Sequence, residues 1–137
     1  MLREDYLMRL IEQVADVLAQ IAGHERKREY EVAIDEAGRA WDELLGVPRA
    51  VVEVTDSATL AELLRDPAKI RAASQLLAAE ARVTKGRGDP LGAAVLYRRA
   101  LELVLEARAL EPAESDDARV FELSREVPAS TIDARYR

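Results

Sequence analysis

The stretch GRGDPLGAAVLYRRALELVLEARALEP, residues 86–112, gives the clearest indication of the fold. Its leading glycines are typical of a chain in which a helix has just ended. Asp89 and Pro90 then begin a new helix, because aspartate caps helix starts and proline is favoured at the first helical position. Apolar residues recur from there to Leu110. The stretch therefore predicts the second helix of an antiparallel hairpin.

The rest of the chain shows the same helical periodicity, with apolar residues at three- and four-residue steps. We expect five or six helices in one bundle, at about residues 3–22, 26–45, 58–65, 67–85 and 90–110, with a weaker one from about residue 115. Residues 47–56 are the only β-like stretch, and one short strand cannot form a sheet. We expect an extended connector there, with Val51, Val52 and Val54 filling the core.

Length and composition agree with an all-α protein of one domain. The chain has 137 residues, of which 49% are hydrophobic and only 4% aromatic. A core of alanine, leucine and valine suits close-packed helices and supplies few of the residues that favour sheets. We expect one helical domain over residues 1–127. A loose C-terminal tail should follow over residues 128–137, from which Ile132 and Tyr136 can dock.

Charge and residue types argue against several classes of function. The formal net charge of −6 opposes binding to nucleic acid. The absence of cysteine excludes disulfides, thiolate metal sites and a cysteine nucleophile. No apolar run approaches the roughly 18 residues that span a bilayer, and the first residues lack the apolar core of a signal peptide. We expect a cytoplasmic protein that binds neither nucleic acid nor membrane.

Two parts of the chain repeat each other at an offset of 60 residues. Ala33 aligns with Ala93, Ala37 with Tyr97, and Ala40 with Ala100. Together with the Asp89-Pro90 start, these residues resemble the second helix of a tetratricopeptide repeat. The resemblance covers residues 73–103 well and residues 14–44 more weakly, and it implies stacked antiparallel hairpins. The sequence departs from that repeat at Glu80, where an apolar residue is usual, and in the long offset, which includes an inserted connector.

A second resemblance covers most of the chain. It consists of the opening DYLMRLIEQ, residues 5–13, the LLG of residues 44–46 and the later hairpin. Together they resemble a family of short bacterial helical proteins of uncharacterised function. This resemblance implies an all-helical fold and no particular activity.

Basic residues gather at both predicted hairpin turns. The first turn has His24, Arg26, Lys27 and Arg28, and the second has Lys85 and Arg87. If the hairpins stack, both turns lie at one edge and form a basic rim suited to an acidic partner segment. The alternative is ordinary positive charge at helix C-termini. We also expect Arg98, Arg99 and Glu102 to be exposed on the later hairpin and to bind the partner. The predicted partner-binding set is therefore Arg26, Lys27, Arg28, Lys85, Arg87, Arg98, Arg99 and Glu102.

These features favour a non-enzymatic protein–protein interaction module, an adaptor or scaffold that binds a protein or peptide and needs no cofactor. The wide apolar stripe of the first helix also suits a homodimer. The alternative is a ligand-sensing or regulatory domain, with a small-molecule pocket between the connector and the hairpins. An enzyme is not expected, because the one histidine, His24, lies in a turn. The carboxylates also lack the Glu-x-x-His pattern of di-iron sites.

Overall fold

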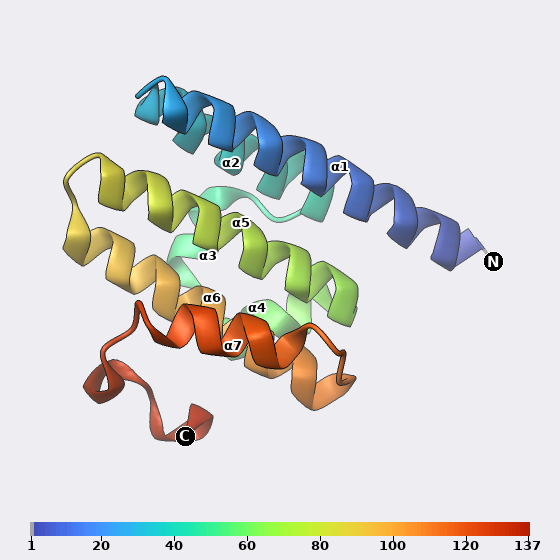
Figure 1. The fold of residues 1–137 in the computed structure, drawn as a ribbon. Coiled ribbons are helices and arrows are strands. Elements are labelled where there is room, and N and C mark those ends of the chain that lie inside the picture. Colours follow the sequence, from blue (N-terminus) through green and yellow to red (C-terminus); the bar gives the residue numbers. More distant parts are fainter. Residues whose placement is uncertain (1) are drawn as a thin grey trace.

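Helices make up almost all of the computed structural model, which describes residues 2–137 (Figure 1). The helices are α1 (Leu2–Arg26), α2 (Tyr30–Leu45), α3 (Arg49–Val54), α4 (Ser57–Leu64), α5 (Pro67–Gly86), α6 (Pro90–Leu110) and α7 (Asp116–Ser124). Two short 3-10 turns follow, at Ala129–Thr131 and Ala134–Tyr136. No strand occurs within the described range. The predicted all-α class is confirmed.

Two long helical hairpins form the body of the molecule. α1 packs against α2, and α5 packs against α6. α5 also contacts both α1 and α2, so the second hairpin stacks on the first through its leading helix. α7 packs on α6, and α4 lies against α6 from the inserted segment between the hairpins. Figure 1 shows α1, α5 and α7 toward the viewer, with α2, α3 and α4 behind them.

The two hairpin turns have the same hydrogen-bond pattern, shifted by 60 residues. The amide N–H of Arg28 donates to the carbonyl oxygen of Glu25 at 3.0 Å, and that of Gly88 donates to Lys85 at 3.0 Å. Glu29 donates to His24 and Asp89 to Thr84 in the same way, at 2.9 and 3.1 Å. Arg28 and Gly88 both have positive φ, at 60° and 98°. The repeat detected in the sequence therefore extends to the conformation of the turns.

α5 supplies much of the core because it is surrounded by other helices. Its Ile70, Ala73, Leu76 and Leu77 are fully buried. The single tryptophan, Trp41 of α2, is also fully buried. Alanines line the faces where the helices approach each other most closely: Ala33, Ala37 and Ala40 in α2, and Ala93, Ala100 and Ala107 in α6. Their small side chains permit the close packing of the hairpins that the sequence predicts.

The inserted segment differs from the prediction. Residues 49–54 form a helix, α3, rather than an extended connector, so residues 2–137 contain seven α-helices instead of the five or six expected. The carbonyl oxygen of Pro48 accepts hydrogen bonds from Val51 and Val52, which begins the helix. Only Val52 is buried, while Val54 is 86% exposed. The strand preference of valine is weak, and the contacts that this segment makes with the hairpins override it.

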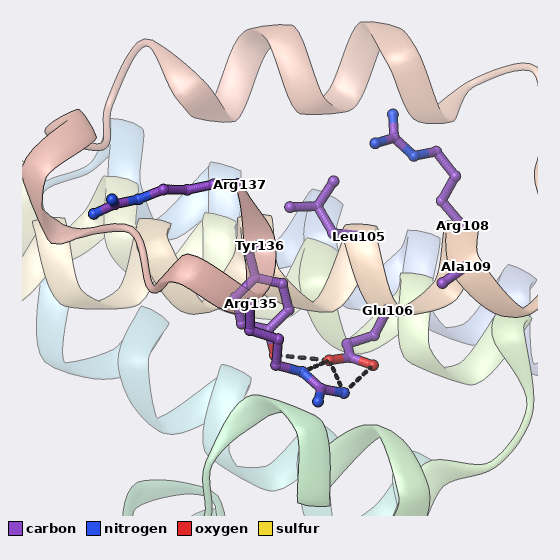
Figure 2. A pocket seen from close by; sticks show the side chains of 7 residues that line it. All are labelled: Leu105, Glu106, Arg108, Ala109, Arg135, Tyr136 and Arg137. Carbon is purple, nitrogen blue, oxygen red and sulfur yellow. Dashed lines mark hydrogen bonds and ion pairs between the residues drawn. The ribbon is translucent and has the colours of Figure 1, made fainter.

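The C-terminal segment, expected to be loose, lies against α6 through defined contacts. Tyr136 donates its hydroxyl hydrogen to Glu106 at 2.7 Å, and the guanidinium of Arg135 donates to the same carboxylate at 3.1 Å (Figure 2). Ile132 packs against the core. These contacts join residues that are about 30 positions apart, which the local sequence pattern does not indicate.

Candidate functional site

The predicted basic rim lies where the two hairpin turns come together. Arg87 forms an ion pair with Glu31 of the first hairpin at 2.6 Å, and Arg82 forms one with Glu25 at 2.8 Å. The ring of Tyr30 lies against Gly86. The two turns are therefore neighbours at one edge of the molecule.

Acidic side chains neutralise part of this rim. Lys85 pairs with Glu126 at 3.0 Å, in addition to the pair between Arg87 and Glu31. The three basic residues of the first turn are exposed and form no ion pair within residues 2–137: Arg26, Lys27 and Arg28. Exposed ion pairs of this kind contribute little to stability. They do lower the positive charge of the rim below what the sequence suggests.

Three residues predicted to be exposed on the later hairpin are instead half-buried. Arg99 donates hydrogen bonds to the carbonyl oxygen of Val52, at 2.6 Å, and to that of Thr55. Glu102 accepts a hydrogen bond from the hydroxyl of Ser57 at 2.7 Å. Arg98, the third, lies beside Arg99. The prediction of exposure was wrong because the inserted segment covers this face of α6.

Arg49, Arg98 and Arg99 meet at a shallow hollow between α3 and α6, which we call the arginine hollow. Its volume is about 370 Å³. The other lining residues are Glu53, Val54, Thr55, Asp56, Val95 and Leu96. Sequence reasoning named Arg98 and Arg99 but missed Arg49, because it treated residues 47–56 as an extended connector that contributes only valines to the core or to a pocket.

Arg49 is held in the hollow by a buried carboxylate. Its Nε and Nη2 atoms donate to the two oxygens of Glu80 at 3.1 and 2.7 Å. The Glu80 side chain is only 7% exposed. The remaining nitrogen, Nη1, is buried, lies 3.6 Å from a Glu53 oxygen and has no hydrogen-bond acceptor among residues 2–137.

The other two arginines lack a carboxylate partner. Neither Arg98 nor Arg99 forms an ion pair within the described part of the chain, and Arg98 Nε is buried without an acceptor. Burial lowers the pKa of Arg99, and repulsion from Arg49 lowers it further. For Arg49, burial acts in the same direction, but Glu80 outweighs it and raises the pKa. Positive charge is therefore incompletely compensated in the hollow.

A larger hollow, of about 460 Å³, lies beside the C-terminal segment (Figure 2). Glu106, Arg135 and Tyr136 line it, and the Glu106 carboxylate accepts hydrogen bonds from both Arg135 and Tyr136. Burial, together with the hydrogen bond to Glu106, raises the pKa of Tyr136. Glu106, Arg135 and Tyr136 thus have partners within the chain, whereas Arg49 Nη1 and Arg98 Nε in the arginine hollow have none among the described residues.

Side chains that would suit an enzyme have other partners. His24 lies in the last turn of α1 and not in the hairpin turn that the sequence predicted, because α1 continues to Arg26. Its Nδ1 atom is 3.1 Å from a carboxylate oxygen of Glu29. The hydroxyls of Ser74 and Thr84 donate to backbone carbonyls, those of Ala100 and Glu80. Among residues 2–137, no three or more His, Asp or Glu side chains gather as metal ligands would. Over the same range, no helix combines the length and apolarity needed to cross a bilayer.

In the comparisons with known proteins, no protein-family model, curated protein or solved structure matches this chain. Its function must be inferred from its own residues.

Proposed function

We propose that this protein is a non-enzymatic protein–protein interaction module, an adaptor or scaffold of the cytoplasm built from two tetratricopeptide-like hairpins. The main supporting observation is the stacking of α5 against both helices of the first hairpin, with turns that repeat at an offset of 60 residues. In proteins built from stacked helical hairpins, each hairpin contacts only the next one, and the stack presents an extended surface to partners.

The distribution of charge adds support for a protein partner. The chain has a net charge of −6, yet Arg98 and Arg99 gather beside Arg49 without a carboxylate of their own. The local positive site favours an acidic partner segment, while the negative net charge opposes the extended phosphate backbone of nucleic acid.

Capture followed by reconstitution tests the proposal. The tagged chain is crosslinked in the cells that express it, and captured proteins are identified, purified and titrated against the purified chain by calorimetry. We expect at least one protein to bind saturably at fixed stoichiometry. A captured set from which no purified member binds the chain would contradict the proposal.

A second copy of the chain is a further candidate partner, because the first half of α1 leaves large apolar side chains exposed. These are Leu2, Tyr6, Met8 and Ile11. Sedimentation equilibrium over a wide range of protein concentration distinguishes a homodimer from a monomer. A dimer that Ile11→Glu dissociates would support self-association through α1, and a monomer mass at every concentration would exclude it.

A further inference from the structure

Resting on the proposed function, we propose that the arginine hollow binds a carboxylate side chain within an acidic, partly apolar peptide segment of a partner protein. The guanidinium groups of Arg49, Arg98 and Arg99 surround the site from two helices, α3 and α6. A guanidinium presents its N–H groups in a planar fork that matches the two oxygens of a carboxylate.

Unpaired donors in the hollow indicate what the ligand supplies. Arg49 Nη1 and Arg98 Nε are both buried and have no acceptor among the described residues. Buried donors are normally paired, and each one left unpaired costs stability. Neither nitrogen is exposed to solvent, so a carboxylate that enters the hollow brings two acceptor oxygens to the guanidinium groups and reaches these donors when the side chains shift.

The charges of the hollow agree with an anionic ligand. Glu80 pairs with Arg49 and neutralises its charge. Glu53 lies farther from Arg49, with 3.6 Å between its carboxylate oxygen and Nη1. Asp56 accepts a hydrogen bond from the backbone N–H of Thr59 at 2.7 Å, because it caps α4. Glu102 and Asp56 attract Arg99 without forming an ion pair with it, so neither Arg98 nor Arg99 has a paired carboxylate within the described residues. A bound carboxylate would also relieve the repulsion that lowers the pKa of Arg99.

Apolar side chains beside the arginines favour a peptide over a free anion. Leu91 and Val95 lie one turn apart on α6 and are exposed, leading toward Arg98 and Arg99. Val54 is 86% exposed on the opposite side of the hollow. An inorganic anion makes no use of these side chains, whereas a peptide with an apolar residue near its carboxylate contacts both kinds of surface.

A peptide library tests the proposal directly. Short end-blocked fluorescent peptides pair Glu or Asp with Leu, Val or Phe at every spacing, and each has a counterpart in which Gln or Asn replaces the acid. Binding is measured by fluorescence polarisation with the full chain. We expect acidic–apolar members to bind, their amide counterparts to bind far more weakly, and Arg98→Gln to weaken binding about tenfold or more.

Matched variants separate the site from general charge effects. Arg9→Gln removes the same charge from an exposed position on α1 that forms no ion pair within the described residues, and it should bind as the wild type does. Arg98→Lys keeps the charge without the planar fork and should bind with intermediate affinity. Circular dichroism and the thermal midpoint confirm that each variant is folded.

Three results of the peptide assay would overturn the inference. One is a library in which no acidic–apolar member binds better than its amide counterpart. Another is equal loss of binding in Arg98→Gln and Arg9→Gln. The last is displacement by inorganic phosphate with no gain from apolar residues, which would leave an anion site only. A captured partner that binds Arg98→Gln as well as the wild type would preserve the interaction module and exclude this site.

Discussion

Arg49 and Glu80 form a two-point ion pair that joins the inserted helix α3 to the central helix α5. The nitrogen–oxygen distances are 3.1 and 2.7 Å, and the two residues are 31 positions apart. Glu80 is the position at which the tetratricopeptide resemblance calls for an apolar residue. The ion pair explains how a carboxylate is tolerated there, since a buried charge needs a partner.

Loss of the Glu80 charge should destabilise the fold strongly. Glu80→Gln leaves the Arg49 guanidinium half-buried without its counter-charge, and we expect the free energy of unfolding to fall by about 2–4 kcal/mol. Urea denaturation followed by the fluorescence of Trp41, the single tryptophan, measures the change.

An apolar replacement of both partners is the control for this prediction. The double variant Glu80→Leu with Arg49→Met removes both charges, so we expect it to recover most of the stability lost in Glu80→Gln. If the single variant were as stable as the wild type, the pair would have no structural role and Glu80 would not need Arg49.

Signals that depend on neighbouring residues were read correctly from the sequence. Asp89 was predicted as a helix cap, and the same Asp-Pro pattern stands at Asp66 and Pro67. The Asp66 carboxylate accepts from Ala68 N–H at 2.8 Å, and that of Asp89 accepts from Gly92 N–H at 2.9 Å. Such caps are set by a few consecutive residues, so no knowledge of the tertiary fold is needed to predict them.

Features that depend on residues far apart in the sequence were not predicted correctly. The arginine hollow brings Arg49 to Arg99 only because α3 lies on α6, and the contact between Arg99 and Val52 spans 47 positions. Periodicity identifies which face of α6 is apolar. It does not indicate that a short inserted helix covers part of the polar face, and so Arg99 and Glu102 were taken for surface residues.

The two turns provide a matched test of backbone strain. Arg28 and Gly88 occupy equivalent positions at positive φ, where a residue with a Cβ atom is strained. We expect Arg28→Gly to raise stability by about 0.5–1 kcal/mol and Gly88→Ala to lower it by about 1 kcal/mol. No atom lies within 4 Å of a Cβ built on Gly88, so the cost there is conformational. Thermal denaturation that shifts in the same direction for both would contradict this.

Asp116 should make the fold sensitive to acid. Its buried carboxylate accepts two hydrogen bonds from Arg71 at 2.8 Å, which lower its pKa, and a third from the Ala113 N–H. Because the pKa is lower in the folded state, the stabilisation is complete above the unfolded value of about 3.9 and is lost as the pH falls below it. We expect Asp116→Asn to cost about 2 kcal/mol at neutral pH and to flatten the acid dependence.

The neighbouring residue supplies the control for the acid prediction. Asp117 is 92% exposed and pairs with Arg108 at 3.2 Å. Asp117→Asn removes the same charge and should retain both the neutral stability and the acid dependence of the wild type. Urea midpoints measured from neutral pH down to about pH 3 compare the three proteins. An equal effect of the two substitutions would show that net charge, and not the Arg71 pair, controls the acid response.

Arg99 should hold the end of α3 in place. The last carbonyl groups of a helix have no partners within it, and the Arg99 guanidinium donates to those of Val52 and Thr55. Arg99→Met keeps an apolar stem and removes the donors, so we expect faster amide exchange over residues 49–56 and a loss of about 1–3 kcal/mol in stability.

Arg98→Met is the control, since Arg98 makes no side-chain hydrogen bond within the described residues, and its exchange pattern should match the wild type. Equal exchange in the two variants would mean that α3 does not depend on Arg99. A difference between them would establish that Arg98 can be replaced without loosening the hollow, so that loss of peptide binding in an Arg98 variant reports on the ligand contact itself.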